Sequence, residues 1–183
     1  MDAAARVFAR KGFHASRVGD IAEEAGVAHG LLYHYFRSKE DVLETIFRET
    51  WGVLVVETRR IEEAGAPLRD QLQRFARVYL GSWLVTPDVI RVLVREVARS
   101  PEVGRRVEEI REVFVGLAHI IEAAKERGEV RADCDSVLAA WIVYGSLEEI
   151  LTGWALGQLP DGEADVEQAV STVVDLTHAG LAA

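Results

Sequence analysis

The residues with the most distinctive chemistry lie in one short stretch, from His29 to Tyr35. If this stretch is a helix, Leu32 and Phe36, four positions apart, form its buried face. The opposite face, formed by His29, Gly30, Tyr33 and His34, carries no charged side chain, and its histidine and tyrosine side chains are planar hydrogen-bond donors. Such donors can reach base edges, and a glycine lets the backbone come close to a base or a phosphate. The pattern therefore favours nucleic-acid contact, although each histidine could also be a plain surface residue.

The neighbouring residues predict a helix-turn-helix that would position this face. Ser16 can cap a helix that has apolar residues at the i, i+3, i+4 and i+7 positions: Val18, Ile21, Ala22 and Ala25. Gly26 ends that helix, a tight turn follows, and residues 28–36 form a helix short enough to lie in a major groove. The motif spans about residues 17–36. Lys39 falls in the first turn of a fourth helix, where free N–H groups and a cation can hold one phosphate together.

Charge is unevenly distributed along the chain. The formal net charge is −9, which by itself argues against a nucleic-acid partner. Residues 1–50 hold seven Lys and Arg against eight Asp and Glu, so most of the negative charge lies further along the chain. Between residues 10 and 39 there are five basic and three acidic residues. A small basic surface on an acidic protein suits a DNA-binding domain whose remainder is repelled by phosphate.

The rest of the sequence predicts helices throughout. Only 4 prolines occur in the chain, which leaves room for long helices, and no window shows the alternation of a strand. Helix start signals of a hydroxyl residue, a proline and an acid occur at residues 86–88 and 100–102. We therefore expect an all-α fold of nine helices, divided within the fourth helix into a small N-terminal domain of residues 1–47 and a larger domain of residues 48–183.

Three segments in the first quarter of the chain match one known pattern at many spaced positions: FARKGF at 8–13, IAEEAGV at 21–27 and GLLYHYFRSKE at 30–40. Together they resemble the signature of the TetR family of transcriptional repressors. The resemblance implies a homodimer that binds palindromic operator DNA and is released by a small-molecule effector. It also implies which residues lie against phosphates or bases: Ser16, Arg17, Tyr33, Tyr35 and Lys39, with His29, Gly30 and His34 lining the recognition helix.

Two departures from the family pattern concern the same contacts. Ala28 stands where the family commonly has Ser or Thr, which removes a cap and a phosphate contact. The chain also begins within the expected second turn of the first helix, without the basic arm of many family members. A separate alternative concerns the two tyrosines: Tyr33 and Tyr35 could pack within the protein instead of contacting DNA.

A second set of residues predicts a binding cavity in the larger domain. Aromatic and apolar residues spread over its helices: Trp51, Leu54, Phe75, Tyr79, Trp83, Phe114 and Leu117. Such residues are as readily core as cavity lining, but the family usually keeps an effector pocket here. Nearby arginines form either a solvated stripe or the rim of an anion site: Arg91, Arg95, Arg99, Arg105 and Arg106.

The segment YGSLEEILTGWAL at residues 144–156 is similar to TetR-type regulators of fatty-acid metabolism, which sense acyl-CoA. The resemblance implies a long-chain acyl-CoA as effector. The aromatic residues would then line a dry slot for the acyl chain, and the arginines would pair with the phosphates of CoA. The alternative is a repressor of the same fold that senses a neutral, drug-like lipophile.

The helix predicted over residues 135–158 is apolar nearly all round, which is typical of a helix buried on every side. Gly145, Gly153 and Gly157 lie on one stripe with Glu149, and each glycine costs about 0.5–1 kcal/mol relative to alanine. The family resemblance implies that this helix and the last one pair with their two-fold copies. We assign six residues to that interface: Gly145, Glu149, Gly153, Trp154, Val170 and Val173. Otherwise the helix is the core of a monomer.

Other functional classes lack support in the sequence. There is no Glu-x-x-His pair, no His-Glu-x-x-His and no phosphate-loop glycine pattern, and the single Cys134 has no identifiable base. We therefore expect no catalytic residue, no metal and no cofactor other than the effector. A helical adaptor for proteins alone would not explain the uncharged Tyr and His face. No signal peptide or bilayer-spanning run is visible, so we expect a cytoplasmic protein without a membrane partner.

Overall fold

The computed structural model describes residues 1–97 and 107–183, and it places nine helices within these ranges. Three short helices come first: α1 (Asp2–Lys11), α2 (Val18–Ala25) and α3 (His29–Tyr35). Six helices follow: α4 (Lys39–Ala64), α5 (Leu68–Val85), α6 (Pro87–Val97), α7 (Val107–Glu126), α8 (Ser136–Ala155) and α9 (Glu163–Leu181). Within the described ranges the only β-type pairing is an isolated bridge between Val130 and Ala182. The all-α fold expected from the sequence is confirmed.

Local side-chain signals set several helix boundaries. The Ser38 hydroxyl accepts a hydrogen bond from the backbone N–H of Asp41 at the start of α4. Asp135 does the same for two backbone donors at the start of α8, where the first N–H groups of a helix otherwise lack partners. Gly26 and Gly65 end α2 and α4 with φ of 67° and 58°, a conformation that a glycine adopts without strain.

The start of α2 differs from the expectation. Ser16 does not cap this helix, because its hydroxyl donates instead to the carbonyl of Gly12 at 2.7 Å. The backbone N–H of Arg17 donates to the carboxylate of Asp20 at 2.8 Å, so the cap is provided by Asp20, the third residue of the helix. The start signal expected for α7 at residues 100–102 lies outside the described residues.

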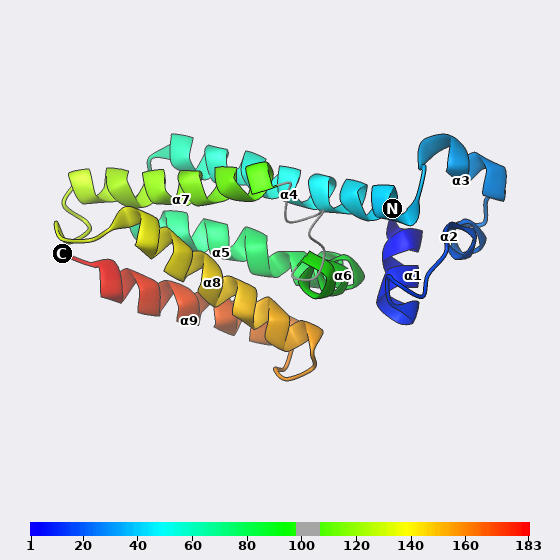
Figure 1. Cartoon of the computed structure of the whole chain (residues 1–183). Helices are drawn as coiled ribbons and strands as arrows, with labels where there is room; N and C mark the ends of the chain where they lie inside the picture. Colours follow the sequence, from blue (N-terminus) through cyan, green and yellow to red (C-terminus); the bar gives the residue numbers. More distant parts are fainter. Residues whose placement is uncertain (98–106) are drawn as a thin grey trace.

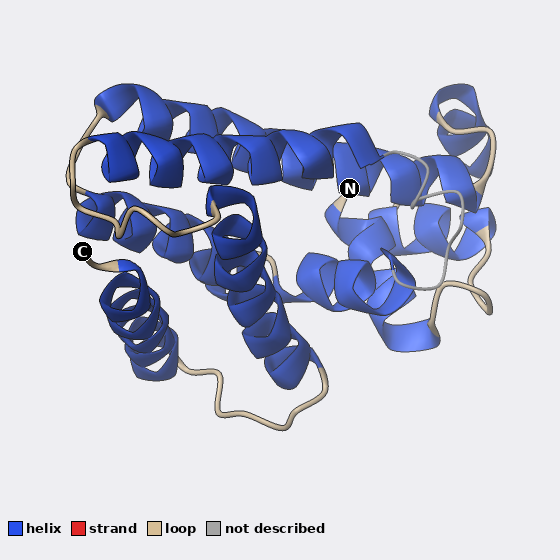
Figure 2. Ribbon diagram, turned by 60° about the vertical axis from the view of Figure 1, so that its left-hand side comes forward, coloured by secondary structure: helices blue, strands red, loops and turns tan. Residues whose placement is uncertain are grey.

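The helices form two groups that share α4 (Figures 1 and 2). α1, α2 and α3 gather around the N-terminal end of α4, and α5 to α9 form a bundle with the rest of it. α7 packs along α4, and α9 packs along α5. Apolar residues from both groups belong to one continuous core, so the α1–α3 group is held by packing as well as by the chain.

α6 is a second connection between the two groups. It packs closely against α1 as well as against α5 and α8. Val92 and Glu96 on α6 are buried, and the carboxylate of Glu96 lies 3.9 Å from the imidazole of His14, just beyond the end of α1. A movement of α6 within the bundle must therefore also displace α1.

Candidate functional sites

α3 presents an uncharged face to solvent. Tyr33 and Tyr35 are 57% and 68% exposed, and His29, Gly30 and His34 are exposed too. A β-carbon at Gly30 would meet no atom within 4 Å, so the space above the backbone is open to close approach. The structure thus brings these five predicted residues together on one accessible helix.

Leu31 belongs to the same accessible surface, and the sequence analysis missed it. Its side chain is 48% exposed, whereas Leu32 and Phe36 pack against the core. An apolar side chain at this place can contact the methyl group of thymine. The available signal was its position next to Gly30, outside the i, i+4 spacing of the two core residues.

Lys39 holds the loop between α1 and α2. Its ammonium group donates to the carbonyls of Phe13, His14 and Ser16 at 3.0, 2.8 and 3.2 Å, and it lies 4.8 Å from the centre of the Phe13 ring. Because an ammonium group has three N–H donors, all of them are used. The Ser16 side chain is buried and bonded to Gly12. The expectation that Lys39 and Ser16 lie against phosphates is therefore corrected, because their polar groups are already bonded within the protein.

Three cationic side chains of α1 also form ion pairs with carboxylates of α2. Glu24 on α2 accepts hydrogen bonds from Arg6 and Arg10 at 2.8 and 2.9 Å, and these bonds hold the pKa of Glu24 below its usual value. Lys11 pairs with Asp20 at 2.7 Å. The three pairs fasten α1 to α2.

Among the described residues beside α3, two arginines remain for an anionic partner. Arg17, at the start of α2, and Arg37, after α3, are exposed. Neither guanidinium group donates a hydrogen bond within the part of the chain that the structure describes. Since they flank the uncharged α3 face, they are the candidates for phosphate contact, and only Arg17 was among the residues predicted from the sequence.

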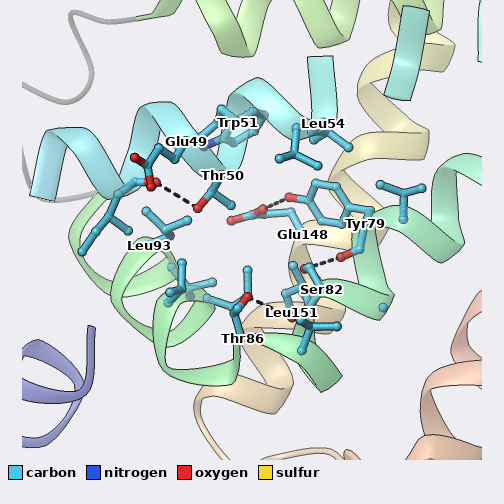
Figure 3. Close-up of a pocket in the computed structure, with 18 of the residues that line it drawn as sticks. Glu49, Thr50, Trp51, Leu54, Tyr79, Ser82, Thr86, Leu93, Glu148 and Leu151 are labelled. Carbon is cyan, nitrogen blue, oxygen red and sulfur yellow. Dashed lines mark hydrogen bonds between the residues drawn. The ribbon is translucent and has the colours of Figure 1, made fainter. Parts of the chain in front are cut away.

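A cavity of about 690 Å³ opens in the larger domain, walled mainly by α4, α5, α6 and α8 (Figure 3). This volume is within the range of small-molecule sites, about 300–1,000 Å³. Its walls are mostly apolar: Ile46, Val53, Leu54, Val78, Val85, Val89, Ile90, Leu93, Val94, Ile110 and Leu151. Of the residues predicted to line a ligand site, Trp51, Leu54 and Tyr79 do so.

Three other predicted aromatic residues lie in the core behind the cavity wall. Phe75 is buried and stacks on Tyr79, with 6.1 Å between ring centres. Trp83 packs against the indole of Trp154, and Phe114 stacks on Trp141 at 4.0 Å. The prediction that Phe75, Trp83 and Phe114 line the ligand site is therefore corrected, because all three are buried and other aromatic rings cover theirs.

The arginines described on α6 do not form the rim of this cavity. Arg91 pairs with Asp88 at 3.1 Å and lies 4.8 Å from the centre of the Trp83 ring. Arg95 donates to the carbonyl of Ala155 at the end of α8. Both belong to a face of α6 other than its cavity face, so their assignment as ligand contacts is corrected. The predicted Arg99 and Arg106, with Arg105, lie outside the described residues.

The cavity contains one cluster of polar side chains, which we call the phenol–carboxylate cluster: Tyr79, Tyr144 and Glu148. Oε2 of Glu148 accepts hydrogen bonds from both phenol groups, and the two phenol oxygens are 3.0 Å apart. Burial, reinforced by the Glu148 carboxylate, raises the pKa of Tyr79 and of Tyr144. Both phenols are therefore protonated donors at neutral pH.

α8 and α9 also carry an exposed surface, only part of which agrees with the predicted interface. Gly145 and Glu149 are exposed, and they lie on α8 beside large apolar residues that are 58–68% exposed: Leu138, Val137, Trp141 and Ile142. On α9, Leu176 is 70% exposed. We call the exposed apolar residues Val137, Leu138, Trp141, Ile142 and Leu176 the apolar face of α8 and α9.

The other four residues assigned to that interface are buried within the chain. A β-carbon at Gly153 would lie 2.6 Å from Cδ1 of Leu159, so this glycine permits packing of the α8–α9 loop. The indole N–H of Trp154 donates to the carbonyl of Pro160 at 2.9 Å. Val170 and Val173 face the core. Gly153, Trp154, Val170 and Val173 are thus corrected from interface residues to internal packing residues.

Within the described residues there is no group of three or more His, Cys, Asp or Glu that could hold a metal ion. None of the helices in these ranges is long and apolar enough to span a bilayer.

Two family models match the sequence. The model of bacterial regulatory proteins of the tetR family matches residues 1–46, and that of the AefR-like transcriptional repressor C-terminal domain matches residues 68–180. Among curated proteins, the fatty acid metabolism regulator protein of Bacillus subtilis is 27% identical over 99% of this chain and 93% of its own length. The transcriptional repressor KstR2 of Rhodococcus jostii is 28% identical over 100% of this chain and 89% of its own length.

Solved structures show the same similarity over the whole chain. FadR of Bacillus subtilis in complex with stearoyl-CoA has a TM-score of 0.85 and 27% identity, covering 98% of this chain and 96% of that chain. The fatty acid degradation regulator FadR of Bacillus halodurans has a TM-score of 0.83 and 28% identity, with the same coverage.

The position of Lys39 leads to a stability prediction. We expect Lys39→Ala to lower the free energy of unfolding by about 1–3 kcal/mol, because three carbonyls, two of them in partly buried hydrogen bonds, lose a charged donor. Arg37→Ala is the matched control, since it removes a nearby cation without internal hydrogen bonds, and it should leave stability close to unchanged. Urea unfolding measures both. Equal stability of the two variants would contradict the anchoring role of Lys39.

Proposed function

The chain belongs to the TetR family of bacterial regulatory proteins, and on this basis we propose that it is a repressor that binds palindromic operator DNA as a homodimer and is released by a long-chain acyl-CoA. The observation that carries the proposal is the double role of α6. This helix lines the cavity through Val89, Ile90, Leu93 and Val94 and packs on α1 of the α1–α3 group. Ligand in the cavity and the position of α3 are therefore mechanically linked.

Release requires only a small coupling between the two sites. A ligand that needs α6 to move also displaces α1, and the ion pairs of Glu24 carry α2 along with α1. α3 packs on α2, so the recognition helix follows. In a dimer the two recognition helices must be about 34–36 Å apart to read half-sites one helical turn apart. A coupling of about 1–3 kcal/mol corresponds to 5–150-fold weaker DNA binding.

The DNA-binding part of the proposal can be tested at Arg17. We expect Arg17→Ala to weaken binding of the dimer to all duplex sequences alike and to reduce the slope of log affinity against log salt by about two units, because each of the two subunits loses one phosphate contact. Arg60→Ala removes an exposed arginine at the far end of α4 and is the control. Affinities are measured by fluorescence anisotropy over a range of salt concentrations. Failure of the unaltered protein to retain any duplex DNA at low salt would refute the proposal.

The choice of effector is supported by the cavity and by the relatives. The walls are mostly apolar, which suits a hydrocarbon chain. Nearly the whole chain matches the fatty acid metabolism regulator protein of Bacillus subtilis and the fatty acid degradation regulator FadR of Bacillus halodurans. It also matches FadR of Bacillus subtilis, which was solved in complex with stearoyl-CoA. A regulator of this kind acts on the chromosome, so the proposal includes a cytoplasmic protein without enzymatic activity.

Gly81 on α5 provides a test of the effector site. It lines the cavity, and a β-carbon there would meet no atom within 4 Å, so a side chain can leave the backbone at this point and Gly81→Phe takes up cavity volume. We expect the variant to bind operator but to need at least about tenfold more stearoyl-CoA for release. Gly52→Phe is the control, because Gly52 on α4 also has free space but does not line the cavity. Release by a neutral lipophile but by no acyl-CoA would instead favour the drug-sensing alternative.

The apolar face of α8 and α9 supports the homodimer. Large apolar side chains gathered on an exposed helix surface are costly in water and mark an interaction surface. The family resemblance assigns these two helices to a two-fold interface, and Gly145 and Glu149 lie on the exposed part of α8. A self-complementary pairing of α8 and α9 with their copies would bury this face.

Ile142, which is 68% exposed, is the residue with which to test this dimer. We expect Ile142→Arg to give a monomer, because two arginines would meet within an apolar contact at the two-fold axis. Val56→Arg places the same charge on an exposed apolar position of α4, outside the apolar face of α8 and α9, and should leave the dimer intact. Light scattering distinguishes the two states, and a monomeric unaltered chain would overturn the proposed assembly.

A further inference from the structure

The phenol–carboxylate cluster imposes a chemical requirement on whatever occupies the cavity. A saturated hydrocarbon chain needs only apolar walls, yet Tyr79 on α5 and both Tyr144 and Glu148 on α8 line this cavity. Figure 3 shows Glu148 directed at Tyr79 through one carboxylate oxygen, while the other oxygen points into the cavity. That second oxygen, Oε1, accepts no hydrogen bond within the described residues.

The hydroxyl groups around the cavity have no proton left for a ligand. Each phenol of the cluster donates to Glu148. Thr50, Ser82 and Thr86 also line the cavity, and each donates to a backbone carbonyl of its own or the preceding turn. A hydroxyl group has one proton to donate. The cluster therefore offers an acceptor, Oε1 of Glu148, and no donor.

The charge of the described lining leads to the same conclusion. Asp2, Glu49 and Glu148 are acidic, and the one cationic side chain of this lining, Arg77, pairs with Glu167 on α9 at 3.2 Å. A carboxylate or phosphate of a ligand placed against Glu148 would face like charge in a mostly apolar site, which is costly. A ligand carbonyl finds a donor elsewhere, at the indole N–H of Trp51 on α4, which has no hydrogen bond within the described residues. The group that fits at Glu148 is a neutral donor.

Resting on the proposed acyl-CoA response, we propose that Glu148 selects long-chain acyl-CoAs whose acyl chain carries a hydroxyl group. The hydroxyl donates to Oε1 of Glu148, and Tyr79 and Tyr144 hold the carboxylate in place from the other side. A keto group at the same carbon has no proton and places its oxygen against a carboxylate oxygen. A methylene group leaves Oε1 without a partner away from water, which is also unfavourable. The order of effectiveness is hydroxyl, then methylene, then keto.

The competing explanation is that the cluster only joins α5 to α8. The hydrogen bond from Tyr79 to Glu148 joins these two helices. If this is its only role, the bond does not depend on which acyl chain lies beside it. The two explanations differ in one measurable quantity, which is the ratio of the concentrations of hydroxylated and keto acyl-CoA needed for release.

The experiment titrates a preformed operator complex with three ligands: stearoyl-CoA, hydroxystearoyl-CoA and oxostearoyl-CoA. The two substituted chains carry their oxygen at the same carbon, and a series of positions along the chain is tested. With the hydroxyl group at one position or a few adjacent ones, we expect hydroxystearoyl-CoA to release the complex at a concentration about tenfold lower than stearoyl-CoA. The reason is that only the hydroxylated chain forms a hydrogen bond to the charged Glu148. We expect oxostearoyl-CoA to need more than stearoyl-CoA.

Glu148→Gln tests the assignment to this residue. The amide oxygen has to accept the phenol protons, so the amide N–H₂ replaces Oε1 and becomes a donor. We expect the preference for hydroxyl over keto at that position to fall to less than about twofold or to reverse. Glu126→Gln, which removes an exposed carboxylate of α7 outside the cavity, should keep the preference of the unaltered chain. Thermal melting verifies that each variant is folded.

Each outcome decides between the explanations. If stearoyl-CoA releases the complex, and hydroxystearoyl-CoA and oxostearoyl-CoA are needed at equal concentrations for every position of the oxygen, the selection by Glu148 is overturned. The proposed effector class then still stands. A preference that persists in Glu148→Gln also overturns it. No release by any of the three ligands overturns the proposed effector and this inference together. The comparison of ligands on the unaltered chain needs no variant, so a misfolded Glu148→Gln does not prevent a decision.

Discussion

The packing of α6 between the cavity and α1 is the constraint on which the two sites of this protein depend. One face of α6 supplies the apolar wall formed by Val89, Ile90, Leu93 and Val94, while Val92 and Glu96 are buried and the helix packs on α1. Its two arginines contact neighbouring helices, since Arg91 lies over the Trp83 ring of α5 and Arg95 donates to the Ala155 carbonyl of α8. Because packed helices move as units rather than deform continuously, a helix with every face in use can transmit a ligand-dependent shift.

Such transmission requires that the α1–α3 group respond as one body. The ion pairs of Glu24 and Asp20 join α2 to α1, and Lys39 joins the start of α4 to the loop between α1 and α2. These contacts use cations that would otherwise be available for phosphates, which leaves Arg17 and Arg37 exposed beside α3. The small domain therefore combines internal rigidity with a recognition face made of uncharged side chains and open backbone at Gly30.

The cavity combines apolar walls with a single polar cluster, and these two features determine different properties of a ligand. Apolar area contributes affinity without direction, whereas a hydrogen bond to a fixed carboxylate oxygen depends on the position and the kind of group that meets it. Glu148 is held by two protonated phenols from two helices, so its free oxygen has a defined direction. Discrimination between similar chains can therefore arise at this one point of an otherwise permissive cavity.

The sequence by itself determined the helices and the family signature, while the tertiary structure decided which side chains are free to function. Gly26, Ser38 and Gly65 act on backbone groups a few residues away, so their effects can be read from local sequence. Lys39, by contrast, bonds to carbonyls 23–26 positions earlier in the chain, and Trp83 is covered by Trp154. Helical periodicity identifies an apolar or charged face, but it contains no information about which distant element covers that face. Whether such a residue lines a cavity, joins a core or meets a partner is settled only when the helices pack.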